Sequence, residues 1–395
     1  MKHILTFLFL LSFITACSSP AASTAQPPTN IPATTASDVN VSPTQIPNTP
    51  EPEKINAPLV DNPALVSLDM LNEKDGWAVS EKQILRTNDG CVTWYDLTPP
   101  NVTETGNSVQ TFFLDVNHAW VQIPDFNNYP NAGTLYHTID GGITWASSST
   151  PFSAGNIKFL DDKKGWVLAD LGAGAGSQGV AVFQTTDGGA TWNQTYTNDP
   201  NQPGSGDSLP LGGIKSGLEA LNMQTAWVTG VTYSDGTVYL YRTDDGGRTW
   251  SQQSLPLPLG AEKTQIGINH LELVSPTDGF LLLNIPSDVY QVAIYVTHDA
   301  GNTWTLTPTL IPQGGSVNFL SATEMIIYNG EQFYVTRDAA HTWSIIPPDV
   351  VFGDNFANMD FVSASIGWVI TSDANSHRSL YHTDDGGATW STVIP

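Results

Sequence analysis

An eight-residue segment near the end of the chain, Thr383–Trp390 (TDDGGATW), occurs six more times in related form. Every copy keeps the opening Thr, an Asp two residues later, a second Thr and the closing Trp. The copies are Thr87–Trp94, Thr138–Trp145, Thr185–Trp192, Thr243–Trp250, Thr297–Trp304, Thr336–Trp343 and Thr383–Trp390. The closing tryptophans lie 39–58 residues apart. A period of this length indicates a propeller or a solenoid.

Each copy follows a short β-prone run such as Tyr239–Arg242 and precedes a second run that we expect to begin with the motif's own Thr-Trp. A strand, an Asp-Gly turn and another strand predict a β-hairpin. The conserved spacing gives seven turn aspartates a structural role, because a carboxylate can accept hydrogen bonds from the N–H groups of its own turn. These are Asp89, Asp140, Asp187, Asp245, Asp299, Asp338 and Asp385. Cys91 and Ala340 replace the fifth-position glycine in two copies, which predicts backbone strain there.

Four strand-like runs, which we call a to d, can be read in each unit. In the third unit they are Asn156–Leu160, Gly165–Ala169, Val180–Thr185 and Thr191–Tyr196, and the glycine-rich stretch Asp170–Gly179 reads as a loop. Seven four-stranded units favour an all-β fold, a seven-bladed β-propeller spanning residues 63–395. Whether each blade is complete or residues 54–59 add a strand is left open by the pattern.

Two positions around the a–b turn recur in the units. A short polar residue follows strand a and is explained by hydrogen bonds to the turn backbone. These residues are Asp69, Asp115, Asp161, Asn222, Ser275, Ser321 and Ser363. An aromatic residue then opens strand b in six units, and the sixth unit has Met325-Ile326 instead. We interpret these rings as blade core. They are Trp77, Trp120, Trp166, Trp227, Phe280 and Trp368.

Strand polarity places the short a–b and c–d turns on one face of the disc and the variable b–c and d–a loops on the other. Loops of variable length on a rigid scaffold commonly carry binding residues. The exposed aromatics predicted for this variable face are Phe126, Tyr129, Tyr233 and Tyr290. The same loops carry four aspartates that provide an alternative, carboxylate-based site: Asp125, Asp235, Asp288 and Asp373. Each sits in turn-like sequence, which is the commoner reason for an aspartate there.

The repeated motif resembles the Asp-box, or bacterial neuraminidase repeat, with its pattern Ser/Thr-x-Asp-x-Gly-x-Thr-Trp. This resemblance implies a propeller in which the boxes lie at the blade periphery, away from any active site. Together with Gly76–Val79 (GWAV), the repeats are also similar to propellers related to photosystem II assembly and stability factors. That similarity implies a seven-bladed, non-catalytic scaffold that engages proteins. The arginine patch described for photosynthetic members has no counterpart, because the arginines here are scattered.

The first 16 residues read as a short targeting segment, with Lys2 and His3 before an apolar run from Ile4 to Ile14. That run is too short to span a bilayer. Its end resembles a bacterial lipobox, which implies that Cys17 becomes lipidated. Residues 17–62 are rich in Pro, Thr, Ser and Ala, a composition that predicts a disordered tether. The chain is therefore expected on the extracytoplasmic side of a bacterial membrane, lipid-anchored and monomeric.

The formal net charge of −24 disfavours nucleic acid and anionic lipid as partners, since both require clustered cations. Proteins and glycans remain candidate partners, and acidity favours solubility. With Cys17 lipidated, only Cys91 is left, so no intrachain disulfide is expected, and Cys91 is interpreted as a buried small residue. The histidines lack metal-ligand spacing, and no phosphate-binding loop or nucleophile elbow is present. We therefore predict neither metal nor cofactor.

Asp-boxes are shared with two classes of enzyme, sialidases and glycan-cleaving propellers. A sialidase resembles its relatives in an arginine triad, which Arg86, Arg242, Arg248 and Arg337 cannot supply because they lie before or within the boxes. A glycoside hydrolase needs two carboxylates across a glycosidic bond, and the loop aspartates offer such a pair in principle. The main hypothesis is a non-catalytic scaffold that binds a protein partner, and the alternative is a glycan-binding or glycan-cleaving propeller.

Overall fold

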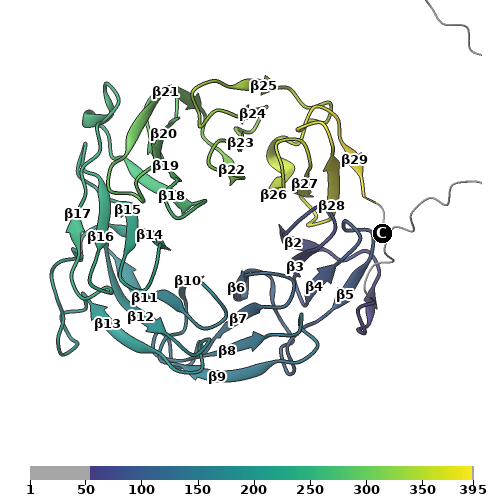
Figure 1. The fold of residues 1–395 in the computed structure, drawn as a ribbon, viewed down its shortest axis with the longest axis horizontal. Helices are drawn as coiled ribbons and strands as arrows, with labels where there is room; N and C mark the ends of the chain where they lie inside the picture. Colours follow the sequence, from purple (N-terminus) through teal and green to yellow (C-terminus); the bar gives the residue numbers. More distant parts are fainter. Residues whose placement is uncertain (1–53, 394–395) are drawn as a thin grey trace, which may run out of the picture. The chain divides into compact units, whose positions relative to one another are not determined.

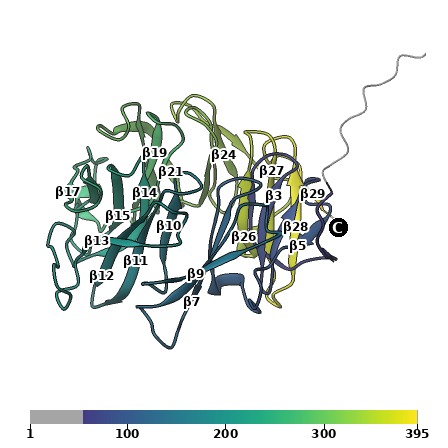
Figure 2. The same ribbon diagram turned by 60° about the horizontal axis from the view of Figure 1, so that its bottom comes forward.

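Antiparallel β-sheets stand side by side around a central axis in the computed structural model, which describes residues 54–393 (Figure 1). The first strand of each unit lies innermost and the last lies at the rim. Figure 2 shows the strands running between the two faces of the ring. An all-β propeller is therefore confirmed. Residues 1–53, including the predicted signal segment, Cys17 and most of the tether, lie outside the described residues.

The strands of the first three units form three separate sheets. The first sheet contains β1 Leu59–Val60, β2 Leu65–Met70, β3 Gly76–Ser80, β4 Ile84–Thr87 and β5 Trp94–Asp96. The second contains β6 Gln110–Phe113, β7 Ala119–Pro124, β8 Gly133–Thr138 and β9 Ala146–Thr150. The third contains β10 Gly155–Phe159, β11 Gly165–Gly174, β12 Ser177–Thr185 and β13 Asn193–Thr197.

The fourth and fifth units share one eight-stranded sheet. It contains β14 Ile214–Ala220, β15 Ala226–Val231, β16 Tyr239–Thr243, β17 Ser251–Gln252, β18 Gly267–Leu273, β19 Gly279–Ile285, β20 Gln291–Thr297 and β21 Thr305–Pro312. The two halves are joined by a single residue pair, Val231 with Gly267. The described strands thus form six sheets, five of one unit each and one of two.

The last two units form four-stranded sheets. They contain β22 Ser316–Phe319, β23 Met325–Tyr328, β24 Phe333–Thr336 and β25 Ser344–Ile346, then β26 Phe356–Phe361, β27 Gly367–Ser372, β28 Arg378–Thr383 and β29 Ser391–Thr392. Three short 3-10 helices, η1 Gly106–Ser108, η2 Ala261–Lys263 and η3 Gly353–Asn355, lie in connections between successive units.

The hydrophobic core is divided among the layers between neighbouring sheets. Trp77, Trp120, Trp166, Trp227 and Trp368 are almost completely buried there, which confirms the prediction that they form blade core. Several tie adjacent units through the indole N–H: Trp77 Nε1 donates to the Asp115 carbonyl at 3.1 Å, and Trp120 Nε1 donates to the Gly188 carbonyl at 2.8 Å. Buried indoles with a satisfied N–H both fill and orient such a layer.

The ring closes where β2 of the first sheet packs against β26 of the last. Leu65, Leu68 and Met70 share a core cluster with Trp368 and Ile370, and the Met70 N–H donates to Asp360 Oδ2. Each unit supplies its own four strands. Leu59, the last residue of the stretch for which an added strand was left open, pairs together with Val60 as β1 with the outer edge of β5.

Three local predictions need correction. The strand after the repeated turn begins beyond the Trp in six units, as in β13 at Asn193, because the second Thr is still bonded to the turn carboxylate. The expected loop at 170–179 is an extended hairpin whose strands continue to Gly174 and restart at Ser177. Asp69 is not a turn residue: it lies within β2 opposite Trp77, and Asn72 caps that turn instead, accepting the N–H groups of Lys74 and Asp75.

Candidate functional site

The repeated turns share one hydrogen-bond network. In all seven, the first Thr hydroxyl donates to the Asp carboxylate and accepts the N–H of the fifth residue, and the second Thr N–H donates to the same carboxylate; in the third copy these distances are 2.8, 3.0 and 2.9 Å. Burial acts to raise the pKa of Asp187, but the bonds from Thr191 and Thr185 prevail and lower it. The carboxylate and the first Thr hydroxyl thus bond within the turn. This agrees with a structural role for the seven aspartates.

The four predicted loop aromatics are exposed, by 73% for Phe126, 43% for Tyr129, 58% for Tyr233 and 38% for Tyr290. They are not gathered into one site. Tyr129 Oη donates to Asp170 Oδ2 at 2.9 Å in the neighbouring sheet, which occupies its hydroxyl. Of these four, only Tyr233 lines the pocket of about 730 Å³ described below.

The four loop aspartates lie in four different loops, and none lines that pocket. Asp125 accepts the Asn128 side-chain amide at 2.7 Å and the Asn127 N–H at 3.0 Å, and these bonds lower its pKa. Asp373 accepts the His377 N–H at 2.9 Å and the Asn375 N–H at 2.8 Å, and its pKa is lowered likewise. A carboxylate engaged in this way serves its own turn and is a poor general acid at neutral pH.

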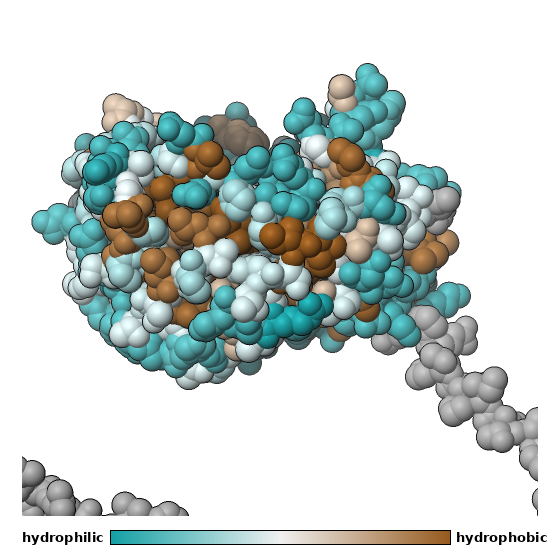
Figure 3. Space-filling view, turned by 90° about the horizontal axis from the view of Figure 1, so that it is seen from above, coloured by the Kyte–Doolittle hydropathy of each residue, from teal (hydrophilic) through white to brown (hydrophobic). Residues whose placement is uncertain are grey.

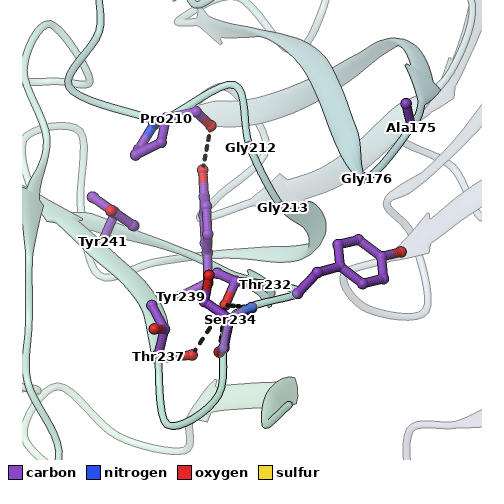
Figure 4. A pocket seen from close by; sticks show the side chains of 11 residues that line it. Ala175, Gly176, Pro210, Gly212, Gly213, Thr232, Ser234, Thr237, Tyr239 and Tyr241 are labelled. Carbon is purple, nitrogen blue, oxygen red and sulfur yellow. Dashed lines mark hydrogen bonds between the residues drawn. The ribbon is translucent and has the colours of Figure 1, made fainter.

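A pocket of about 730 Å³ opens between the third and fourth units. Its walls come from the tip of the β11–β12 hairpin, the β13–β14 connection and the β15–β16 loop, all of which belong to the variable face, together with strand β16 (Figure 4). The lining residues are Ala175, Gly176, Pro210, Gly212, Gly213, Thr232, Tyr233, Ser234, Thr237, Tyr239 and Tyr241. The prediction of a functional face thus coincides with the position of this pocket, although the pocket itself needed three loops to be placed together.

The aromatic side of the pocket is held by ring packing and a hydrogen bond. Tyr239 and Tyr241 lie with ring centroids 4.7 Å apart, and Tyr239 Oη donates to the Pro210 carbonyl at 3.1 Å (Figure 4). Burial raises the pKa of both phenols, so both stay neutral at physiological pH. Gly176 has a φ of 77°, and a Cβ there would come within 2.9 Å of the Tyr233 ring. The hairpin tip therefore contacts Tyr233 closely only because residue 176 is glycine.

The lining side chains are uncharged, being hydroxyls, aromatic rings, alanine and proline, with glycines that expose backbone groups. Pro210, which lines this pocket, and the adjacent Leu211 border a second pocket of about 800 Å³. The other residues that line the second pocket are Asn198, Pro200, Ser205, Gly206 and Asp207. An apolar, aromatic cavity with a few convergent polar groups is the usual form of a small-molecule or glycan site.

A row of mostly polar residues, which the sequence analysis did not single out, lies on the innermost strands. In each unit one residue pairs with the strand-b aromatic position, and six of these seven residues are polar: Asp69, Lys158, Glu219, Glu272, Asn318 and Asp360, with Phe112 in the second unit. Lys158 Nζ contacts Glu219 Oε2 at 3.0 Å. Burial raises the pKa of Glu219 and of Asp360 to about 7, in Asp360 with a further rise from the charge of Asp69. Aligning the units by their turns would have exposed this polar position.

Neither the pocket nor the row of residues on the innermost strands has the composition of a metal centre. Within residues 54–393, no three His, Cys, Asp or Glu side chains converge as ion ligands would. The same residues contain no helix of the length and apolarity needed to cross a bilayer. Cys91 is buried, as predicted.

No family model matches the chain. Two curated relatives are similar over part of it: a xyloglucanase from Paenibacillus sp. is 26% identical over 160 residues, and the xyloglucanase Xgh74A from Acetivibrio thermocellus is 27% identical over 165 residues. These matches cover 35% and 36% of this chain but only 15% and 19% of the relatives. The chain thus matches less than a fifth of the length of either.

Solved structures similar in fold include a xyloglucanase, YCF48 and a polysaccharide lyase. The GH74 xyloglucanase from Xanthomonas campestris superposes with a TM-score of 0.56 at 12% identity, over 86% of this chain and 55% of that one. YCF48 from Cyanidioschyzon merolae gives 0.51 at 17% identity, over 84% and 96%. A PL25 ulvan lyase gives 0.51 at 13% identity, over 85% and 96%. At these identities the likeness establishes the propeller fold.

Proposed function

We propose that this protein binds a neutral polysaccharide in the pocket between its third and fourth units. The observation that carries this proposal is the lining: three tyrosines, hydroxyls and backbone groups around about 730 Å³, with no charged side chain among them. The volume lies within the range typical of ligand sites. Tyrosine offers a flat apolar face for the C–H side of a sugar ring and a hydroxyl for its polar edge.

Charge supports a neutral ligand over an acidic one. The chain carries a formal net charge of −24, and a polyanionic glycan would meet this field without a cationic lining to offset it. The partial matches to xyloglucanases, proteins named for a neutral polysaccharide, support a glycan ligand in preference to the protein-binding scaffold that the repeats first indicated.

Binding without cleavage is the form of activity that the pocket supports. Hydrolysis by the common route requires two carboxyl groups flanking the scissile bond, about 5–9.5 Å apart. No lining residue is a carboxylate, and Asp125 and Asp373 cap their own turns. If the protein does cleave glycans, Asp235 is the first candidate, because it lies in the same loop as the lining residues Ser234 and Thr237.

The number of blades and the location of the protein in the cell are part of the same proposal. We infer seven blades, one per repeated turn, with the eight-stranded sheet counting as two because a single residue pair joins its halves. Lipidation of Cys17 would anchor a monomer to the extracytoplasmic side of a bacterial membrane. A polysaccharide-binding pocket on the variable face is suited to that position.

A protein-binding scaffold is the second candidate. It is favoured by the superposition on YCF48, which is covered over 96% of its length, and another solved structure shows YCF48 bound to a D1 peptide. A single propeller of this size therefore suffices for peptide binding in at least one protein of similar fold.

Titration calorimetry of the full chain with xyloglucan, alongside a reducing-sugar assay, tests the proposal. We expect binding without sugar release, and Tyr233→Ala and Tyr241→Ala should each weaken it about ten-fold, since losing an aromatic contact costs on the order of 1–2 kcal/mol. Tyr290→Ala is the matched control, because this exposed tyrosine of the fifth unit lies outside the pocket.

Absence of binding to xyloglucan and to other neutral polysaccharides would refute the proposal, and capture of a protein would then favour the scaffold. Sugar release that Asp235→Asn abolishes would replace the binding module with a hydrolase.

A further inference from the structure

A second pocket adjoins the proposed binding site on the variable face. We call the pocket of about 730 Å³ the tyrosine pocket, and the neighbouring pocket of about 800 Å³, which the β13–β14 connection lines, the loop pocket. Apolar side chains are also exposed on the outer side of the ring that carries β21 and β25 (Figure 3). A concave site with polar groups at its wall is a more specific indication of a ligand than such a surface.

The loop pocket is formed by a loop that is fixed at both ends. Near its start, the Gly206 N–H donates to the Thr197 carbonyl at 2.9 Å, which folds the loop back onto the third unit. Near its end, Leu209 is completely buried, and its N–H donates to Tyr196 Oη at 2.8 Å. The pocket is therefore preformed, and a ligand does not have to order the loop on binding.

The two pockets have a wall in common. Pro210 lines both of them, Leu211 lines the loop pocket, and Gly212 and Gly213 line the tyrosine pocket. Residues 210–213, which we call the partition, thus have a pocket on each side. A chain-like ligand that leaves one pocket across the partition enters the other.

The partition is held in place from the side of the tyrosine pocket. Tyr239 Oη donates to the Pro210 carbonyl at 3.1 Å (Figure 4), and the Gly213 N–H donates to the Gly176 carbonyl at 2.8 Å. Leu211 is 40% exposed, so the partition carries an apolar side chain at the surface. The apolar side of a sugar ring can pack on such a group, which makes the crossing itself favourable.

The loop pocket contains one charged side chain, Asp207. It is exposed, and its carboxylate forms no hydrogen bond or ion pair with any residue between 54 and 393. Asp199 in the same loop differs, because it accepts the Asn201 N–H at 2.9 Å and so serves its own turn. The Asp207 carboxylate therefore keeps both oxygens available as acceptors for a ligand.

Hydroxyl groups of a neutral sugar are suitable donors to this carboxylate. Hydrogen bonds from a hydroxyl to a carboxylate are roughly twice as strong as those between neutral groups. A metal ion is a poorer match, because among residues 54–393 no two further His, Cys, Asp or Glu side chains converge with Asp207 to hold one. An acidic sugar is a poorer match too, since its carboxylate would face that of Asp207.

We propose that the loop pocket is a second subsite for the polysaccharide, in which Asp207 accepts hydrogen bonds from the hydroxyl groups of a sugar residue beyond the partition. This subsite rests on the proposed function of the tyrosine pocket. It narrows the ligand to a neutral glycan chain long enough to occupy both pockets, with aromatic packing at one end and hydroxyl recognition at the other.

Two adjacent subsites make affinity depend on chain length. A short fragment fills the tyrosine pocket alone. A longer fragment reaches the loop pocket while already bound, so the second set of contacts adds affinity without a second loss of translational freedom. Affinity should therefore rise with length and become constant once both pockets are filled.

Oligosaccharides made by partial hydrolysis of xyloglucan, separated by size and titrated calorimetrically into the full chain, test this. Wild-type affinity should rise at least ten-fold from the shortest fragment that binds to the longest. Asp207→Ala should weaken the longest fragments about ten-fold, the effect of one hydrogen bond to a charged group, and leave the shortest unchanged. Tyr233→Ala should weaken fragments of every length.

Asp354→Ala is the matched control. Asp354 is likewise an exposed aspartate in a d–a connection, but it lies between the sixth and seventh units and lines neither pocket. This variant should bind every fragment like the wild type. Because Asp207 forms no bonds within the protein, Asp207→Ala should keep the wild-type circular dichroism spectrum and Tm.

Two kinds of failure can be told apart. Wild-type affinity independent of fragment length, unchanged binding of the longest fragments to Asp207→Ala, or an equal loss at every length would overturn the second subsite and leave the proposed function standing. Absence of wild-type binding to every fragment and to the intact polysaccharide would refute the proposed function, and the subsite with it.

Discussion

The fifth position of each repeated turn shows how one backbone angle limits residue choice. All seven positions have a positive φ, from 63° at Ala340 and 72° at Cys91 to 96° at Gly387. Left-handed backbone is costly for residues with a Cβ, and its minimum lies near +57°. The two turns with a Cβ lie closer to that minimum than most of the glycine turns. The strain predicted for Cys91 and Ala340 is therefore reduced, because their φ angles lie nearer the left-handed minimum than those of most glycine turns.

Glycine turns far from that minimum should not tolerate alanine. Gly189 has a φ of 89°, and a Cβ there would lie 2.4 Å from Leu135 Cδ2. We expect Gly189→Ala to lower the free energy of unfolding by about 2–4 kcal/mol, from left-handed strain and overpacking together. Denaturant unfolding measures this. Gly204→Ala is the control: its φ is 78°, but nothing lies within 4 Å. Equal losses in the two variants would show that packing at residue 189 contributes nothing.

At the scale of the elements, the strand-b tryptophans join one sheet to the next. Trp120 stacks on Phe159 of the third unit with centroids 3.8 Å apart, and its indole N–H is bonded to Gly188 of that unit. Trp368 occupies the corresponding place in the last unit, but its buried Nε1 has no partner among the described residues. The same residue type thus makes different contributions at two blade interfaces.

Replacing each of these tryptophans by phenylalanine separates the hydrogen bond from the packing. Trp120→Phe leaves the Gly188 carbonyl without its donor, whereas Trp368→Phe removes a donor that is already unpaired. We expect Trp120→Phe to destabilise the protein by about 1–3 kcal/mol more than Trp368→Phe, the cost of an unsatisfied buried polar group. The midpoints of urea unfolding test the difference. A greater loss in Trp368→Phe would contradict it.

At the scale of the whole molecule, two sets of carboxylates make the stability of the protein depend on pH in opposite directions. Lowered pKa values are found at Asp140, Asp187, Asp245, Asp299, Asp338 and Asp385, in Asp338 to about 2 because the Thr342 hydroxyl is bonded to it. Their contribution is present above the ordinary pKa and is lost as the pH falls. Asp360 and Glu219 have pKa values raised to about 7, so the folded state binds more protons than the unfolded state and stability falls as the pH rises through 4–7. Maximal stability is therefore expected at about pH 4–6.

Asp360→Asn should remove part of the alkaline slope. It takes away a half-buried charge beside Asp69 at the closure of the ring while keeping an oxygen that can accept the Met70 N–H. We expect the Tm at pH 8 to rise by on the order of 2 °C and the Tm at pH 4.5 to change little. Scanning calorimetry at the two pH values provides the measurement. An unchanged difference in Tm between them would mean that Asp360 does not contribute to the slope.

Local chemistry explains what was predictable. In the repeated Thr-x-Asp turn the Thr hydroxyl and the Asp carboxylate form their hydrogen bonds within eight residues, and the strand-b aromatic follows a turn at a constant distance. Hairpins, repeat period, core rings and the variable face could therefore be inferred from the sequence, and so could the exposure of Tyr233. The error at Asp69 arose locally too, because Asp and Asn are both good turn residues and one unit was aligned three positions out of register.

The sequence by itself thus determined an all-β propeller of repeated hairpins, since period and turn hydrogen bonds are encoded within each unit. Only the tertiary structure decided where residues from different units meet. Asp69 and Asp360 come together because the ring closes, and the pocket exists because three loops from two units converge on Tyr239.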